Sequence, residues 1–192
     1  MKILVTGASG LVGRALCALL DDRGFPVRAA VRSALPISPG LDCVGIDSID
    51  GQTCWSRALA GTNIVVHLAA RVHVMNEATA DPLAEFRRVN VQGTLNLARQ
   101  AAAAGLQRFV FVSSVKVNGE LTQAGQAFSE SDSPNPEDHY GISKWEAEQG
   151  LLQIARETGL QVVIIRPPLV YGPGVKANFA ALMRAVQRGW PL

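Results

Sequence analysis

Tyr140 and Lys144, which lie four residues apart, are the pair of side chains in this sequence most suited to moving a proton. On a helix this spacing places both side chains on one face. A free tyrosine is a poor base at neutral pH because its pKa is about 10, and a lysine ammonium within a few ångströms stabilises the phenolate and lowers that pKa. We therefore expect Tyr140 to act as a general acid or base and Lys144 to tune it.

Ser114 completes this set, because it follows residues 108–113, an apolar segment that predicts a buried strand. Its hydroxyl could hydrogen-bond the same substrate oxygen as the tyrosine. A serine, a tyrosine and a lysine in these roles suit hydride transfer at a secondary alcohol or ketone. The positive charge of an oxidised nicotinamide would lower the tyrosine pKa further. The pattern Y-x-x-x-K alone is common on helices, so this interpretation depends on a cofactor site elsewhere in the chain.

A glycine-rich turn near the amino terminus provides such a site. Gly7, Gly10 and Gly13 follow the apolar segment 2–6, which predicts a buried strand, and the third glycine opens an apolar pattern with helical spacing. Backbone N–H groups and the positive end of the helix dipole would meet where a pyrophosphate could lie. The spacing departs from G-x-G-x-x-G by one residue in the first gap. A tight turn that binds no ligand is the alternative, but this context favours a nucleotide.

The end of the second predicted strand, residues 27–31, bears on which dinucleotide binds. An acidic residue there would accept hydrogen bonds from the adenosine ribose, whereas an arginine suits the 2′-phosphate of NADP. Here the acid is missing and Arg32 follows the strand directly. We expect NAD or NADP, with Arg32 favouring NADP. Arg28 alternates with the buried positions and could also reach the site; a solvated surface arginine is the alternative.

Strand and helix signals alternate along the whole chain. Strands are predicted over residues 2–6, 27–31, 43–47, 63–70, 108–113 and 161–165. Helices are predicted after Gly13 and over residues 53–60, 82–105, 140–157 and 177–188. This alternation predicts an α/β fold with a doubly wound parallel sheet of Rossmann type and helices on both faces. His67, in the fourth strand, is expected to be a packed histidine rather than a catalyst.

Composition and charge exclude several classes of protein. Eighteen basic and sixteen acidic residues leave a net charge of +2, too small for a nucleic-acid or membrane surface. No apolar run approaches the ~20 residues needed to span a bilayer, and the amino terminus reads as a strand, so we expect a cytoplasmic protein. Cys17, Cys43 and Cys54 lack C-x-x-C spacing, so neither a disulfide framework nor a metal site is expected.

Together these motifs resemble the extended short-chain dehydrogenase/reductases, and within them the NAD-dependent epimerase/dehydratase family. The resemblance covers essentially the whole chain through T-G-A-S-G-L-V-G, H-L-A-A, V-N-V-Q-G-T, F-V-S-S-V-K-V-N-G, Y-G-I-S-K and R-P-P-L-V-Y-G-P-G. It implies that Ser114, Tyr140 and Lys144 are catalytic and that Lys144 also bonds the nicotinamide ribose. It further implies sites for the pyrophosphate at Gly7, Gly10, Leu11, Val12 and Gly13, for the adenine at Asp47 and Ser48, and for the nicotinamide side at Leu68, Ala69, Ala70, Asn90, Pro167 and Pro168.

Departures from the family patterns narrow the expected reaction. Sugar-nucleotide dehydratases carry a threonine followed by Asp-Glu where this chain has Ser114, Val115 and Lys116, so an acid/base pair for eliminating water is missing. The resemblance therefore implies a nucleotide-sugar epimerase that moves hydride at C4, similar to the UDP-glucose 4-epimerases and acting on a UDP-linked sugar. Two alternatives stay open: an NADP-dependent reductase of 4-keto sugars or of dihydroflavonol type, and a non-catalytic regulator that senses NADP.

The carboxyl-terminal part of the chain bears on domain organisation. Relatives continue past the Y-G-P-G motif into a smaller domain that recognises the nucleotide sugar. We therefore expect residues 1–192 to form the NAD(P)-binding domain, with residues 168–192 leading into a truncated substrate-binding region. Relatives also form homodimers through the helix that carries the tyrosine and its neighbour, which makes a homodimer an open expectation here.

Overall fold

A six-stranded parallel sheet forms the centre of the molecule. The computed structural model describes residues 1–32, 40–72, 81–122, 124–175 and 177–190. The strand order β3-β2-β1-β4-β5-β6 is that of a doubly wound Rossmann sheet. Successive strands are added in one direction from β1 to β3 and in the other direction from β4 to β6. The predicted fold class is confirmed. The strands are β1 (Ile3–Thr6), β2 (Val27–Val31), β3 (Asp42–Gly45), β4 (Ile64–His67), β5 (Arg108–Val112) and β6 (Gln161–Ile165).

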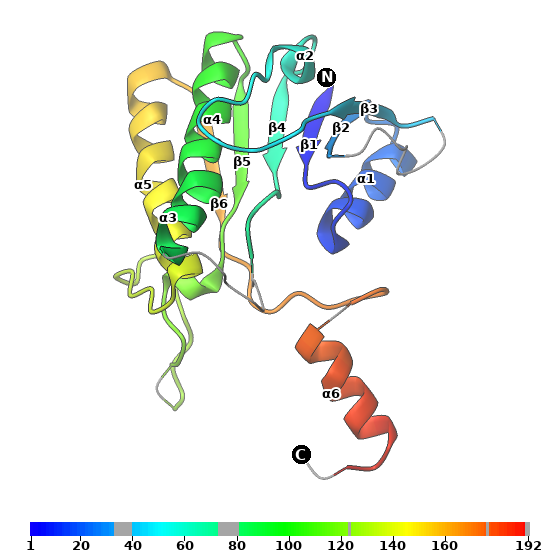
Figure 1. Cartoon of the computed structure of the whole chain (residues 1–192), viewed down its shortest axis with the longest axis vertical. Helices are drawn as coiled ribbons and strands as arrows, with labels where there is room; N and C mark the ends of the chain where they lie inside the picture. Colours follow the sequence, from blue (N-terminus) through cyan, green and yellow to red (C-terminus); the bar gives the residue numbers. More distant parts are fainter. Residues whose placement is uncertain (33–39, 73–80, 123, 176, 191–192) are drawn as a thin grey trace.

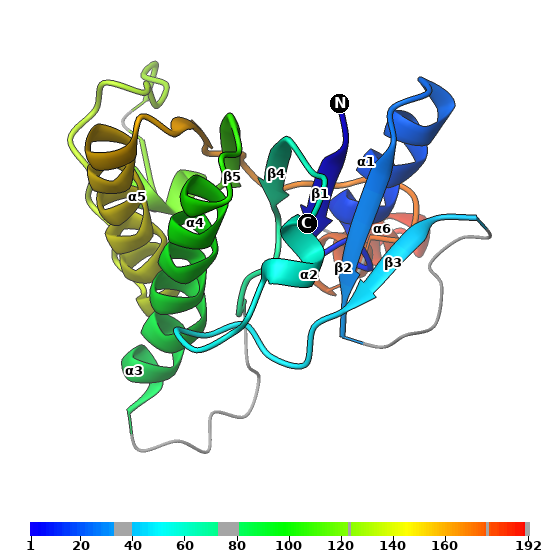
Figure 2. The same cartoon turned by 90° about the horizontal axis from the view of Figure 1, so that it is seen from above.

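Helices pack on both faces of this sheet (Figures 1 and 2). α1 lies on one face, over β1 and β2, whereas α2, α4 and α5 lie on the other. The helical segments are α1 (Leu11–Asp22), α2 (Ser56–Leu59), α3 (Pro82–Phe86), the π-helical turn η1 (Arg87–Gly93), α4 (Thr94–Ala103), the 3-10 turn η2 (Val115–Val117), α5 (His139–Thr158) and α6 (Ala177–Gln187).

Two apolar clusters explain why the first strand is apolar at successive positions. Leu4 points into the cluster that α2, α4 and α5 form with the sheet, where Phe109 and Phe111 are fully buried. Ile3 and Val5 point the other way, into the cluster that includes Cys17 of α1. A parallel strand covered on both faces must be apolar on both faces, as the sequence pattern indicated.

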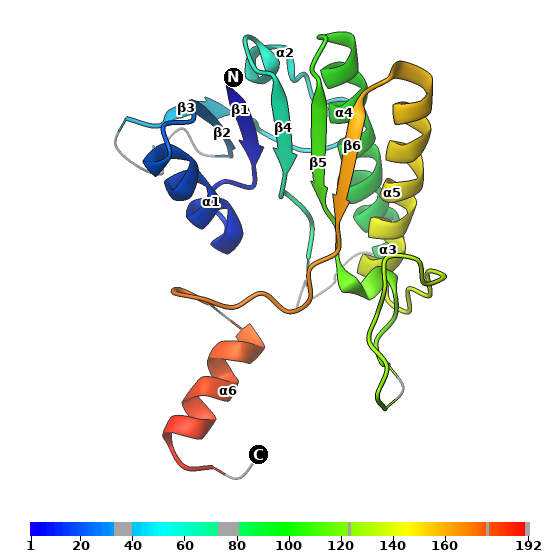
Figure 3. The same cartoon turned by 180° about the vertical axis from the view of Figure 1, so that it is seen from behind.

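The carboxyl ends of the strands meet at one edge of the sheet, at the lower side of the sheet in Figure 3. The glycine turn after β1, the turn η2 after β5 and the first turn of α5 all gather there. The segment that follows β6 crosses below this edge and continues into α6. Ligands of open α/β sheets bind at this edge.

The largest departure from the predicted elements lies in the helix expected over residues 82–105. α3 and α4 are joined by the π-helical turn η1, so the helix changes its winding over Arg87–Gly93. Such turns occur frequently at functional sites. Asn90, in the middle of this turn, is 1% exposed and points into the protein.

Candidate active site

The glycine turn brings β1, β4 and α1 unusually close together. Gly7 has a φ of 66°, a conformation that favours glycine, and a Cβ there would lie 2.7 Å from the backbone nitrogen of Ala69. A Cβ on Gly13 would lie 2.2 Å from the carbonyl oxygen of Gly7. Leu11 and Val12 open α1, so their N–H groups are among those without a partner inside the helix. The turn therefore fits the cradle expected for a pyrophosphate.

Gly13→Ala tests this fit. We expect the free energy of unfolding to fall by about 1–3 kcal/mol, because α1 must move away from the turn, and NAD(P) affinity to fall with it. Urea denaturation and nucleotide titration measure the two effects. Gly45→Ala is the matched control, because a Cβ at that position would meet no atom within 4 Å. Equal effects of the two changes would contradict the proposed cradle.

A groove of about 560 Å³ runs from this turn across the carboxyl ends of β1, β2, β3 and β4. The first turn of α1 has no acidic residue, so no carboxylate of that turn repels a bound anion. Eight of the residues expected from the sequence line it, namely Gly7, Gly10, Arg32, Asp47, Ser48, Leu68, Ala69 and Ala70.

The charged residues of this groove only partly match the expectation. Arg32 is exposed and lines the groove, as do Asp47 and Ser48, and their contacts with a cofactor stay predictions. Arg28 does not reach the groove: its Nη1 donates to the carbonyl oxygen of Ala60 at 2.6 Å and its Nε to Asp42 at 2.9 Å. The expectation that Arg28 could bind the cofactor is therefore wrong, because Arg28 binds carbonyl groups at the end of α2 instead.

Two further arginines in the groove had no motif to mark them. Arg88 comes from η1 and pairs with Glu85 at 2.9 Å and with Asp50 at 3.6 Å. Arg71 follows the small residues after β4, and its guanidinium carbon lies 5.5 Å above the centre of the Phe86 ring. In the sequence, Arg71 directly follows H-L-A-A and Arg88 directly precedes V-N-V-Q, but neither residue belongs to a motif.

Asn90 joins the groove to α5. Its Nδ2 donates to the carbonyl oxygen of Arg71 and to Ser143 Oγ, both at 3.0 Å. Its Oδ1 accepts from the N–H of Arg71 at 2.8 Å. The asparagine thus holds the chain after β4 beside the helix that carries Tyr140 and Lys144. A direct contact between Asn90 and a nicotinamide stays a prediction.

Tyr140 and Ser114 are neighbours, although neither is among the residues that line this groove. Ser114 follows β5 and precedes η2, and its hydroxyl is close enough to the phenol to lower the pKa of Tyr140. Asp138 caps α5 by accepting from the N–H of Gly141 at 2.6 Å, which places Tyr140 in the first turn. The Phe86 ring packs edge-on against Tyr140, with 6.4 Å between ring centres.

The pKa of Tyr140 is raised rather than lowered. Burial is the largest cause, the Asp138 carboxylate adds to it, and Lys116 and the hydrogen bond from Ser114 oppose it. The direction predicted from Lys144 is therefore wrong for this structure. The loss of water around the phenol outweighs the favourable charges near it.

Lys144 lies one turn after Tyr140 and is 1% exposed. Its Nζ lies 3.9 Å above the centre of the Phe111 ring, a cation–π contact. Burial lowers its pKa to about 7, although the Glu148 carboxylate acts in the opposite direction. His67 is also buried and bonds Thr6 at 2.7 Å and Thr94 at 3.0 Å, as a packed histidine does.

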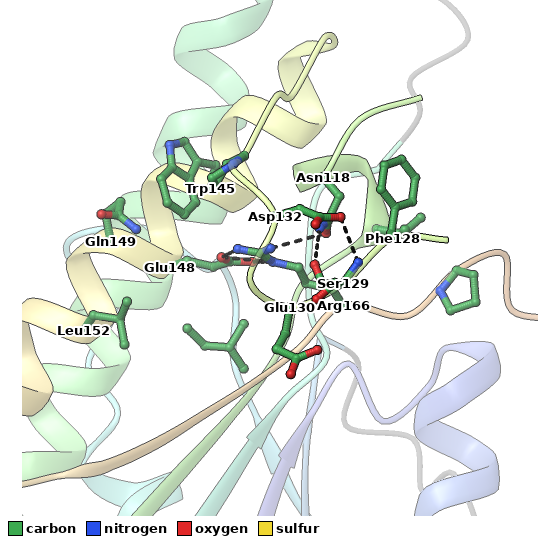
Figure 4. A pocket seen from close by; sticks show the side chains of 14 residues that line it. Asn118, Phe128, Ser129, Glu130, Asp132, Trp145, Glu148, Gln149, Leu152 and Arg166 are labelled. Atoms are coloured by element: carbon green, nitrogen blue, oxygen red, sulfur yellow. Dashed lines mark hydrogen bonds and ion pairs between the residues drawn. The ribbon is translucent and has the colours of Figure 1, made fainter. Parts of the chain in front are cut away.

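An ion pair between Glu148 of α5 and Arg166, which follows β6, lies close to these residues in the chain (Figure 4). Arg166 opens the motif R-P-P-L-V-Y-G-P-G, whereas Glu148 belongs to no motif found in the sequence. Glu148 lies one turn after Lys144, is 1% exposed and accepts from Arg166 Nη2 at 2.6 Å. It also accepts from Ser113 Oγ at 2.5 Å, and Arg166 Nη1 donates to Asn118 at 3.3 Å. The pair therefore ties the ends of β5 and β6 to α5.

Pro168 lines a different pocket, of about 750 Å³, together with Trp145 and Leu152 of α5. It does not line the cofactor groove, so its contact with a cofactor ring stays a prediction. Within the described ranges, no group of three or more His, Cys, Asp or Glu side chains could hold a metal ion. No helix in that part of the chain is both long and apolar enough to cross a membrane.

Comparison with known proteins adds independent observations. The profile of the NAD dependent epimerase/dehydratase family matches residues 3–190. The UDP-glucose 4-epimerase of Vibrio cholerae is 49% identical over 192 residues, which cover 100% of this chain and 58% of that protein. The chain spans a little over half the length of the curated relatives it matches, such as 52% and 58% of two of them.

Two solved structures show the same arrangement of elements. The UDP-glucose 4-epimerase of Thermus thermophilus in complex with NAD has a TM-score of 0.85 and is 26% identical, covering 100% of this chain and 64% of that one. MoeE5 in complex with UDP-glucuronic acid and NAD has a TM-score of 0.82 and is 32% identical, covering 100% of this chain and 63% of that one.

Proposed function

The chain belongs to the NAD-dependent epimerase/dehydratase family, and from that premise we propose that it is the dinucleotide-binding part of a nucleotide-sugar 4-epimerase. The observation that carries the proposal is the approach of the Ser114 hydroxyl to the Tyr140 phenol, at the edge of the sheet where the strands end, with Lys144 one turn further along α5. The similarity to UDP-glucose 4-epimerases favours a UDP-linked hexose as substrate.

Each element of the site has one task in this reaction. The glycine turn and the start of α1 hold the pyrophosphate, and the small residues Ala69 and Ala70, which follow Leu68, let the cofactor approach the backbone. The nicotinamide, when bound, supplies reversible hydride transfer at C4. Tyr140 removes the proton of the C4 hydroxyl and later returns it, while Ser114 holds the same oxygen.

An assay of C4 inversion tests the proposal. We expect UDP-glucose and UDP-galactose to interconvert in the presence of the whole enzyme that contains this dinucleotide-binding part, without net consumption of a reductant. Mass spectrometry of nucleotides retained after purification should identify NAD(P). Stoichiometric oxidation of NADPH by a UDP-4-keto sugar, without inversion of any UDP-hexose, would replace the epimerase proposal by the reductase described next.

The second candidate is an NADP-dependent reductase of 4-keto sugars, which two observations favour. Arg32 lines the groove where an NAD enzyme usually carries an acid. The raised pKa of Tyr140 keeps its phenol protonated near neutral pH, and a protonated phenol suits donation of a proton to a ketone oxygen.

Arg32→Ala separates the two cofactors. We expect NADPH affinity to fall by about 10-fold or more, because a hydrogen bond to a charged phosphate contributes about 1.5–3 kcal/mol. NADH affinity should change by less than about twofold. Fluorescence titration of both nucleotides measures the effect, and Arg57→Ala, at an exposed position of α2, is the control. Equal losses of affinity for NADH and NADPH would show that Arg32 does not bind the 2′-phosphate.

A further inference from the structure

Lys116 joins the two turns that carry Ser114 and Tyr140. It lies in η2, two residues after the serine, and its Nζ contacts Asp138 Oδ2 at 2.5 Å. The other oxygen of Asp138 accepts from the N–H of Gly141 at 2.6 Å. One carboxylate therefore binds the ammonium of η2 with one oxygen and the first turn of α5 with the other.

The backbones of these two turns are also in direct contact. A Cβ on Gly141 would lie 2.9 Å from the carbonyl oxygen of Lys116 and 3.1 Å from Asp138 Oδ1. No side chain larger than hydrogen fits there without a shift of the backbone. Because Tyr140 precedes Gly141 directly, the place of its phenol relative to Ser114 depends on this contact.

We propose that Lys116 is a positioning residue of the proton-transfer site, and that its ion pair with Asp138 holds Tyr140 against Ser114 and balances the charge around the phenol. The proposal rests on the role in proton transfer proposed above for Tyr140. Lys116 also contacts Glu120 at 2.9 Å, and the Lys116 and Asp138 side chains are 29% and 34% exposed, so water screens the pair only in part.

The electrostatic environment of the phenol agrees with this arrangement. Asp138 raises the pKa of Tyr140 and Lys116 lowers it, so the two members of one ion pair act in opposite directions. Lys116 stays charged because its hydrogen bond to Asp138 raises its own pKa. Among the residues that the structure describes, the Ser114 hydroxyl and the Phe86 ring of α3 also lie near the phenol, Lys144 lies one turn further along the same helix, and Arg71 lies above the Phe86 ring.

A spectroscopic titration tests the proposal without requiring turnover. The chain has two tyrosines, so in a Tyr171→Phe background the phenolate absorbance after a rapid pH jump reports Tyr140 alone. We expect Lys116→Met to raise the pKa of Tyr140 further and Asp138→Asn to lower it. Asparagine caps helices as well as aspartate does, so α5 should keep its start. Lys116→Arg is the matched control and should leave the titration as in the parent.

Opposite shifts in Lys116→Met and Asp138→Asn support the proposal, and the double variant should return toward the parent. If the pair only holds the fold together, both changes loosen the turn, admit water to the phenol and move its pKa down in both variants. Shifts in the same direction, or none, would overturn the proposal. Because the titration needs no substrate, opposite shifts in a protein that inverts no sugar would refute the proposed function and leave this inference standing.

Discussion

Replacing Tyr140 by phenylalanine is expected to lower turnover by about 10²- to 10⁴-fold, the range that a well-placed general acid or base contributes. Tyr140 is the acid or base of the proposed mechanism, and its phenol lies close to the Ser114 hydroxyl. Phenylalanine keeps the ring that packs against Phe86 but loses the proton. We therefore expect the free energy of unfolding and NAD(P) affinity to stay close to those of the parent.

Tyr171→Phe is the matched control for this change. Tyr171 is 69% exposed and stacks on Phe179 of α6, with 5.0 Å between ring centres. The Tyr171→Phe substitution removes the same hydroxyl from the other tyrosine of the chain and should leave kcat and KM as in the parent. Steady-state kinetics and nucleotide titration of both variants separate catalysis from binding. If Tyr140→Phe keeps the parent kcat, another group must move the proton and the proposed mechanism is wrong.

Much of the fold could be predicted from the sequence because local patterns and tertiary packing agree. Val5 and Leu4 are both fully buried, on opposite faces of β1, so the apolar run predicts a strand inside a parallel sheet. The glycine positions could be predicted for the same kind of reason. Gly7 and Gly13 must lack a side chain because β4 and α1 approach the turn closely there, and these two glycines produce a recognisable spacing in the sequence.

The features that could not be predicted depend on residues distant in the chain. Arg28 binds the end of α2, about thirty residues further on, and only the packed structure shows this. Val163 and Ile165 of β6 are 41% and 46% exposed although their sequence predicts a strand with apolar faces. The raised pKa of Tyr140 follows from burial, which the spacing of Tyr140 and Lys144 does not report.

The buried pair of Glu148 and Arg166 is expected to be the most sensitive ion pair of the fold. Glu148→Gln should lower the free energy of unfolding by about 3–5 kcal/mol, because it leaves the charge of Arg166 uncompensated. The Arg166 side chain is 18% exposed and that of Glu148 2%, so water replaces the lost partner only in part. Removing the carboxylate also lowers the pKa of Lys144 below its value of about 7, because Glu148 is the group that opposes the effect of burial there.

Glu146→Gln is the matched control on the same helix. Glu146 pairs with Arg87 at 2.5 Å, as closely as Glu148 pairs with Arg166, but these side chains are 32% and 46% exposed. An exposed pair contributes about 0–1 kcal/mol, so urea denaturation should show a small effect for Glu146→Gln. Similar losses in both variants would mean that burial does not decide the strength of these pairs. A large loss confined to Glu148→Gln would show that the ends of β5 and β6, and with them Ser114, depend on this carboxylate for their place beside α5.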